Sequence, residues 1–204
     1  MTRKAISIYM AATCAIVIIA PGRFACGLII GVELILLMLT GLLFKALVKK
    51  INIPNLEQPL MLSFAIFFTI LFKQALILIS PILALQLSFV LFLPAISTFT
   101  TVFLLEEKNI TLKESLVQNM PVSFGFVIYI LFVFLIRDTI GFGTISLPSY
   151  GGLFEIELFS PEKVSFRSFF ATIPGSLVLN ALFLSFYLWF EKKIHIIKNA
   201  GVKK

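Results

Sequence analysis

The sequence predicts an all-α integral membrane protein with six transmembrane helices. Of its 204 residues, 59% are hydrophobic, only 13% are charged and 23 are phenylalanine. A soluble domain carries roughly 45 to 50% apolar residues. The apolar residues also gather in runs that are almost free of charge. Runs of about 20 such residues are long enough to cross the roughly 30 Å hydrocarbon core of a bilayer.

Polar and helix-breaking residues set the limits of these runs. Pro21-Gly22-Arg23 ends the first run, and a lysine-bearing stretch separates the second from the third. Ser80-Pro81 leaves the third and fourth joined by almost nothing, so these two should form a tight antiparallel hairpin. Polar stretches precede the fifth and sixth runs. The predicted spans are residues 5–22, 24–44, 59–80, 82–105, 120–137 and 168–190.

The basic residues predict how this single transmembrane domain, residues 1–204, is oriented. If the N-terminus is cytoplasmic, twelve lysines and arginines fall inside and four outside, with Lys73 within a span. The positive-inside rule then places both termini in the cytoplasm and the loop over 138–167 outside. The net charge of +7 reflects this bias and the basic tail over 191–204. We expect that tail to rest on anionic lipid head groups rather than to bind nucleic acid.

Two cysteines and one histidine limit the chemistry that this chain can hold by itself. Cys14 and Cys26 have no C-x-x-C spacing, which excludes a disulfide framework and a self-contained zinc or ferredoxin site. His195 alone excludes a haem held by two histidines of this chain. The sequence also lacks a phosphate-binding glycine loop, so we do not expect it to be catalytic alone. Cys14, near the middle of the first span, is either packing or one ligand of an iron–sulfur cluster.

Two charged residues lie within predicted spans at similar depth. Glu33 is about nine residues from the outer end of the second span, and Lys73 about seven from the outer end of the third. At about 1.5 Å per residue they differ in depth by only ~3 Å, so a salt bridge is plausible. An isolated charge at mid-bilayer costs at least ~2.5 to 3.5 kcal/mol. These two residues are therefore either a structural pair or part of an ion path.

Small residues and prolines indicate where helices meet or break. Gly27 and Gly31 form a G-x-x-x-G on the second span, a spacing that lets helix backbones approach closely. Pro94 in the fourth span and Pro174-Gly175 in the sixth predict kinks or breaks, because a proline inside a helix leaves a carbonyl unpaired.

Four stretches resemble motifs of one known family. Residues 92–100, Phe-Leu-Pro-Ala-Ile-Ser-Thr-Phe-Thr, are similar to F-I-P-L-I-V-T-N-C, and residues 137–144 are similar to R-E-I-L-G-N-G-T. Residues 156–159, followed by Pro174-Gly175, look like I-E-L-F and then P-P-G-A, and Cys14 falls where the family has G-L-C-P. The chain thus resembles, at low identity over nearly its whole length, the six-helix membrane subunits of the Rnf and Nqr electron-transport complexes. The stretch that looks like I-E-L-F and then P-P-G-A is typical of the RnfE and NqrD branch.

The resemblance implies an architecture and a set of partners. The fold would be an inverted three-plus-three repeat with helices one and four broken near the membrane midplane, and inverted repeats place sites at their interface. The chain would lie in the bacterial cytoplasmic (inner) membrane beside a homologous six-helix subunit of opposite orientation. The two subunits would share a two-iron two-sulfur cluster held by cysteines of their first and fourth helices.

The departures from the family motifs concern the cluster ligands. Thr100 stands in place of the fourth-helix cysteine, Phe99 in place of the preceding asparagine, and Ala15 in place of the proline after the first cysteine. Only Cys14 would be a ligand from this chain, and a hydroxyl is a poor substitute for a thiolate. A cluster with an unusual ligand set, a cluster held elsewhere in the complex, and a divergent architectural subunit all remain open. Cys26 is interpreted as packing.

The resemblance implies a membrane subunit of an ion-translocating electron-transport complex. Ferredoxin or NADH would be oxidised on other membrane and soluble subunits while Na⁺ or H⁺ is moved, and the loop over 138–167 would contact those partners. The alternative is the six-helix substrate-binding component of a vitamin or other small-molecule uptake transporter. Chains of that class have similar length and use small residues on the first helix, such as Ala11 and Ala15, to dock a partner.

Overall fold

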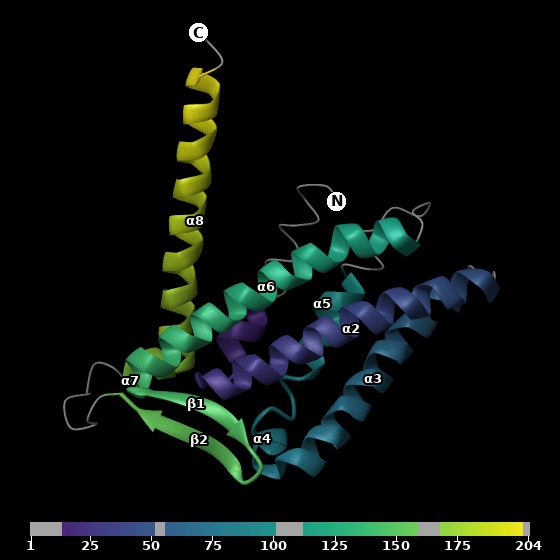
Figure 1. The fold of residues 1–204 in the computed structure, drawn as a ribbon, viewed down its shortest axis with the longest axis horizontal. Coiled ribbons are helices and arrows are strands. Elements are labelled where there is room, and N and C mark those ends of the chain that lie inside the picture. Colours follow the sequence, from purple (N-terminus) through teal and green to yellow (C-terminus); the bar gives the residue numbers. More distant parts are fainter. Residues whose placement is uncertain (1–13, 52–55, 101–111, 159–167, 202–204) are drawn as a thin grey trace.

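The computed structural model describes residues 14–51, 56–100, 112–158 and 168–201, and it is mostly helical. Three of its helices are long and apolar enough to cross a membrane (Figure 1). They are α2 (Phe24–Ile51), α3 (Glu57–Ile79) and α6 (Leu112–Gly141). The lengths and compositions of these helices therefore support a membrane protein. Within the described residues they account for three of the six predicted spans. Helices α2 and α6 also run several residues beyond the predicted limits of 24–44 and 120–137.

The predicted fourth span, 82–105, is not one continuous helix. It consists of α4 (Pro81–Gln86), a run of turns over residues 87–91, and α5 (Phe92–Phe99). Pro81 stands at the start of α4, after the extended Ser80 that ends α3. Pro94 lies in the first turn of α5, where its missing N–H leaves no helical hydrogen bond unmade. The break therefore precedes the proline, and the part of the predicted span beyond Thr100 lies outside the described residues.

The predicted first span is described only in part, and the sixth is broken beside Pro174-Gly175, as the sequence predicts. Of 5–22, only residues from 14 on are described, and 14–19 are helical. The span 168–190 is divided into α7 (Ser168–Ala171) and α8 (Ile173–Gly201), so the break comes just before Pro174. A Cβ on Gly175 would lie 2.0 Å from the Phe169 carbonyl oxygen, so this sharp junction requires glycine. Beyond it, α8 projects away from α2 and α6 (Figure 1).

The loop predicted over 138–167 contains a β-hairpin, so the chain is not all-α. Strands β1 (Thr144–Ser149) and β2 (Gly152–Glu157) pair antiparallel. Gly143 at φ 72° and Gly152 at φ 131° adopt backbone conformations that favour glycine, and they open and turn the hairpin. The hairpin lies across the end of the bundle where α2 begins and α6 ends (Figure 1).

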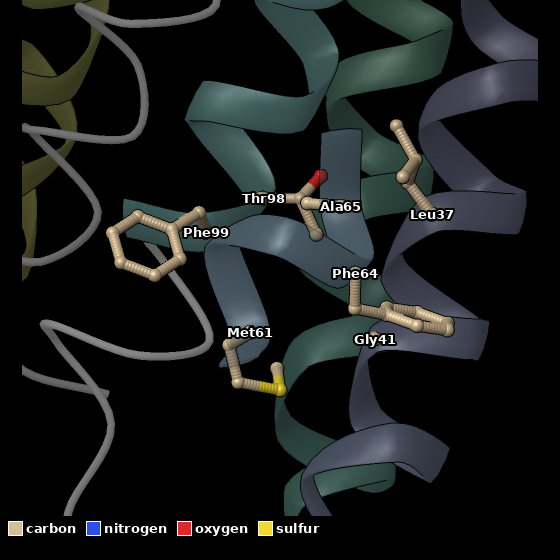
Figure 2. Close-up of a pocket in the computed structure, with 7 residues that line it drawn as sticks. All are labelled: Leu37, Gly41, Met61, Phe64, Ala65, Thr98 and Phe99. Atoms are coloured by element: carbon tan, nitrogen blue, oxygen red, sulfur yellow. The ribbon is translucent and has the colours of Figure 1, made fainter. Parts of the chain in front are cut away.

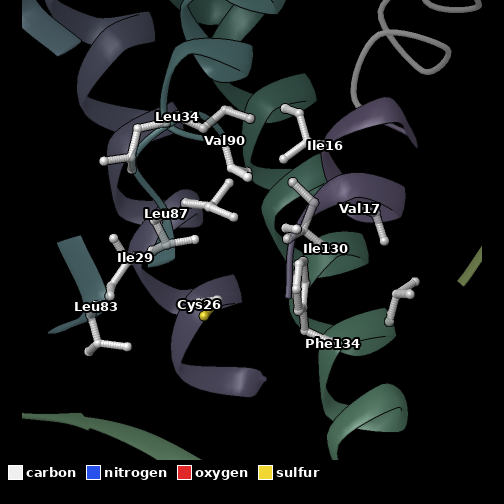
Figure 3. Packing of buried hydrophobic residues seen from close by; sticks show 14 of the residues in the cluster. Ile16, Val17, Cys26, Ile29, Leu34, Leu83, Leu87, Val90, Ile130 and Phe134 are labelled. Carbon is white, nitrogen blue, oxygen red and sulfur yellow. The ribbon is translucent and has the colours of Figure 1, made fainter. Parts of the chain in front are cut away.

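Helices α2 and α6 form the centre of the bundle, because glycines let them approach closely. A Cβ on Gly27 would lie 2.8 Å from Phe134 Cγ, and one on Gly31 would lie 3.0 Å from Val127 Cγ1. The predicted use of the G-x-x-x-G motif for close helix packing is thus confirmed. Around this contact, buried side chains of α2, α6, residues 14–20 and the 81–91 region form the largest apolar cluster (Figure 3). Cys26 is fully buried in it, consistent with packing.

Arg137 connects three chain segments at the hairpin end. Its guanidinium is buried and donates to the carbonyl oxygens of Val17 at 2.7 Å, Ala20 at 3.0 Å and Ala171 at 3.3 Å. The last carbonyls of a helix lack intrahelical donors. One arginine of α6 therefore caps the helix over 14–19 and α7 together.

Asp138, the next residue, fixes the start of α2 and the hairpin. Its Oδ2 accepts hydrogen bonds from the Phe24 N–H at 3.0 Å and from the N–H and hydroxyl of Ser146 at 2.7 and 2.5 Å. Its Oδ1 lies 3.5 Å from Arg23 Nη1, and Arg23 also reaches Glu155 Oε1 at 3.1 Å. A carboxylate at a helix N-terminus is favourable for the helix dipole. We call Arg137 and Asp138 together the joint.

Replacing Asp138 by alanine should destabilise the protein by about 3 to 5 kcal/mol, because it leaves the Phe24 N–H and the N–H and hydroxyl of Ser146 without their buried charged acceptor. The midpoint of thermal unfolding in detergent measures this. Glu157→Ala removes an exposed carboxylate from the same hairpin and should have little effect. Equal midpoints for the two variants would show that the joint does not stabilise the fold.

Gly27→Ala should destabilise by about 1 to 3 kcal/mol, because the added methyl forces α2 away from Phe134. Gly125→Ala on α6 is the matched control, since its new Cβ has no heavy atom within 4 Å. Both changes raise helix propensity alike. Comparing the two unfolding midpoints isolates the helix contact, and a Gly27→Ala variant as stable as Gly125→Ala would contradict it.

Candidate functional site

Glu33 is a carboxyl buried within the bundle without a hydrogen-bond partner. It lies on α2, its side chain has no solvent exposure, and neither carboxyl oxygen is hydrogen-bonded in the described structure. The neighbouring polar group is the Thr69 hydroxyl of α3, also fully buried and without a bond that meets hydrogen-bond geometry. Buried polar atoms are nearly always bonded, so this pair is an exception that calls for an explanation.

The predicted salt bridge between Glu33 and Lys73 is not formed. The Lys73 ammonium instead donates to the Ser88 hydroxyl at 2.6 Å, in the turns after α4. The reason is the register of the antiparallel pair α2 and α3, in which Glu33 lies beside Thr69. Lys73 stands one turn beyond Thr69, about 6 Å along α3, and is therefore displaced by one turn from the Glu33 carboxyl. The sequence estimate of ~3 Å was too small, because a span's end does not fix its register.

An apolar crevice lies between α2, α3 and α5 (Figure 2). It begins at Leu37 and Ala65, one helical turn from Glu33 and Thr69. The crevice is lined by Leu37, Gly41, Met61, Phe64, Ala65, Thr98 and Phe99. The Thr98 hydroxyl is buried and has no hydrogen-bond partner in the structure described. Three helices thus each contribute an unpaired oxygen group to one interface: Glu33, Thr69 and Thr98.

The chemistry of Glu33 follows from these surroundings. An isolated carboxylate in an apolar interior is strongly unfavourable, so the group is neutralised by a proton or by a bound cation. The Thr69 hydroxyl can donate to a carboxylate, or can offer its oxygen to the cation that the carboxylate binds. Oxygen groups of this kind suit H⁺ and hard cations such as Na⁺, and not soft metals.

Cys14 lies next to Tyr129 of α6. The Tyr129 hydroxyl donates to Asn180 Oδ1 of α8 at 2.8 Å, and the Asn180 amide donates to the Ser176 carbonyl at 2.8 Å. Ser176 in turn donates to the Val17 carbonyl at 3.1 Å. These bonds attach α8 to α6 and to the helix over 14–19, a use of polar side chains that is common between membrane helices.

The residues do not fit a cluster held by this chain alone. The Thr100 hydroxyl donates to the Ile96 carbonyl of its own turn at 2.8 Å, while Cys14 faces Tyr129. Within the described residues, no group of three His, Cys, Asp or Glu could hold a metal ion. A two-iron two-sulfur cluster usually takes four thiolates, of which this chain could supply Cys14.

Sequence reasoning found Glu33, Lys73, Cys14 and Thr100 but missed the oxygen groups of Thr69 and Thr98. Both threonines lie within apolar runs, where a hydroxyl carries little signal. A helical count would have found one of them, since Met61, Ala65, Thr69 and Leu76 are the buried residues of α3 and mark the face turned to the bundle.

Comparisons of the chain with models of known families, with curated proteins and with solved structures found no significant match. The resemblance to Rnf and Nqr subunits therefore stays a prediction.

Lys73→Met and Glu33→Leu should each leave thermal stability in detergent unchanged or raised. Lys73→Met loses one hydrogen bond, and Glu33→Leu replaces a buried unpaired carboxyl by an apolar side chain. A salt bridge would give the opposite pattern, in which each single change costs about 3 to 5 kcal/mol and the double change recovers part of it. That pattern would contradict the separation of the two residues described above.

Proposed function

We propose that this chain is a membrane subunit of an ion-translocating electron-transport complex, in which Glu33 binds the transported Na⁺ or H⁺. The buried, unpaired carboxyl carries the proposal. Ionisable residues inside membrane spans are rare, and they pair, face a cavity or mark an ion path. Glu33 is not paired with Lys73, which leaves ion binding as the reading that accounts for its position.

The places that the family motifs occupy in the fold support the electron-transport part. Residues 92–99 form α5 after the break in the fourth apolar run, and residues 137–144 contain the joint and the first residue of β1. Pro174-Gly175 opens α8 immediately after α7. The quoted motifs thus coincide with breaks and junctions of the chain, which are features that a shared architecture would preserve.

The hairpin supports the expectation of partner subunits. Its inner side chains meet the bundle, since Ser146 binds Asp138 and Glu155 binds Arg23. The alternate side chains face the other way, and Phe154 pairs with Leu147 across the strands. The side chains of Leu147, Phe154 and Ile156 are exposed. The proposal places this apolar face on the extracytoplasmic side, where a protein subunit would cover it.

Within this proposal the redox chemistry belongs to the complex. Electrons from ferredoxin or NADH would enter on other subunits, and a cluster, if shared, would be held mostly by cysteines of a homologous partner. Cys14 is the residue of this chain that would contribute a thiolate, beside Tyr129. What the chain itself supplies is the bundle that holds Glu33 and Thr69 away from water.

The test is ion transport by the intact complex in proteoliposomes, driven by reduced ferredoxin or NADH, with Na⁺ uptake and internal pH both recorded. Glu33→Gln should assemble normally and keep electron transfer while ion uptake falls to the level without donor, because an amide neither binds a cation strongly nor releases a proton. Lys73→Met is the matched control and should keep most of the uptake.

Two results would contradict the proposal. Normal uptake by a correctly assembled Glu33→Gln complex would remove Glu33 from the ion path. The electron-transport assignment would be contradicted if the chain, purified under conditions that keep complexes intact, carried no flavin subunit, no iron–sulfur subunit and no iron. If iron is present, loss of the cluster absorption in Cys14→Ser would place this thiol among its ligands.

A further inference from the structure

The interface between α2, α3 and α5 holds more unpaired oxygen than packing can explain. The Thr69 and Thr98 hydroxyls and both Glu33 carboxyl oxygens are buried without a hydrogen-bond partner in the described structure. A buried polar group without a hydrogen-bond partner is unfavourable. Groups that spend part of their time bound to water or to an ion would not carry this cost.

The crevice continues the Glu33 interface along the helix axes in one direction. Leu37 and Gly41 stand one and two turns beyond Glu33 on α2, and Ala65 and Met61 stand one and two turns before Thr69 on α3. The crevice thus extends from about 6 to about 12 Å from the carboxyl. It leads toward the bundle end where α2 carries Lys49 and Lys50, the opposite end from the hairpin.

Gly41 leaves this space open. A Cβ there would have only Thr98 Cγ2 within 4 Å, at 3.9 Å, whereas one on Gly27 would collide with Phe134 at 2.8 Å. Gly27 is therefore required for close helix packing, and Gly41 is not. Its effect is to widen the crevice beside Thr98.

We infer that the crevice between α2, α3 and α5 is the access path by which the cation or proton reaches Glu33 from the lysine-bearing end, with the Thr98 hydroxyl as the intermediate oxygen. This inference rests on the proposed function. By the orientation that the basic residues predict, the path opens to the cytoplasm. The register places Lys45 of α2 and Glu57 of α3 one turn beyond the crevice, so its mouth carries charges of both signs.

Cysteine accessibility tests the path. In vesicles of either orientation that carry the intact complex, Thr98→Cys should react with a membrane-impermeant cationic thiosulfonate from the lysine-bearing side only. The chain with its own Cys14 and Cys26 gives the background. Ile66→Cys, next to Ala65 but exposed on the outer surface of α3, is the matched control and should not react from lipid.

Added sodium chloride should slow the reaction more than an equal concentration of potassium chloride if Na⁺ is the ion, and the two salts should act alike if H⁺ is. A second variant fills the path: Gly41→Leu should lose ion uptake while electron transfer and assembly persist. Gly125→Leu, on open space of α6, should keep uptake.

The outcomes separate the two proposals. Loss of uptake in Glu33→Gln, with an unreactive Thr98→Cys and a normally active Gly41→Leu, would overturn the path and leave the proposed function standing. Reaction of Thr98→Cys from the hairpin side would overturn the direction inferred here. A complex that moves no ion even without substitutions would overturn both.

Discussion

The arrangement of the bundle depends on the buried joint formed by Arg137 and Asp138. These two neighbours at the end of α6 bind opposite kinds of helix terminus. Arg137 binds carbonyls at the C-terminal ends of α7 and of the helix that ends at Ile19, while Asp138 binds the N-terminal N–H of α2 and the start of the hairpin. Removing charges from water costs several kcal/mol per ion, which the hydrogen bonds made by each group offset. The joint therefore determines which helix ends lie together. Apolar contacts do this poorly in a membrane, because lipid chains are as apolar as the side chains they would replace.

That specification sets the position of the candidate site. Once Asp138 fixes the start of α2, the glycine contact with Phe134 and Val127 fixes how α2 lies on α6. Glu33, two residues beyond Gly31, is then turned toward α3 rather than toward α6 or lipid. On α3, the residue beside Glu33 is Thr69, as the register of the antiparallel pair α2 and α3 determines. Lys73 stands one turn beyond Thr69 and donates to Ser88, so Glu33 keeps no cationic partner.

The sequence indicates much of the fold but little of the site. Apolar runs predict α2, α3 and α6, and Ser80-Pro81 and Pro174-Gly175 mark real breaks. The turns over 87–91 carry neither glycine nor proline, so their apolar residues gave no sign of a break. The hairpin was missed because loop length was considered and strand alternation was not. The Glu33–Lys73 pairing failed because depth was counted from uncertain span ends, and an error of one turn is enough to separate two side chains.

The buried carboxyl also explains why the crevice has to be apolar. Polar side chains in place of Leu37 or Ala65, one turn from Glu33 and Thr69, could bond to those two groups, and in the proposed function a cation would then have to displace them. Apolar walls with a few separated oxygens leave the carboxyl unsatisfied, and in the proposed function the binding of a proton or cation would supply the missing interaction. The same walls exclude most water, which strengthens the attraction between ion and carboxylate. A site of this kind is unstable when empty and charged. Such a difference between loaded and empty states is what an energy source must act on to move an ion.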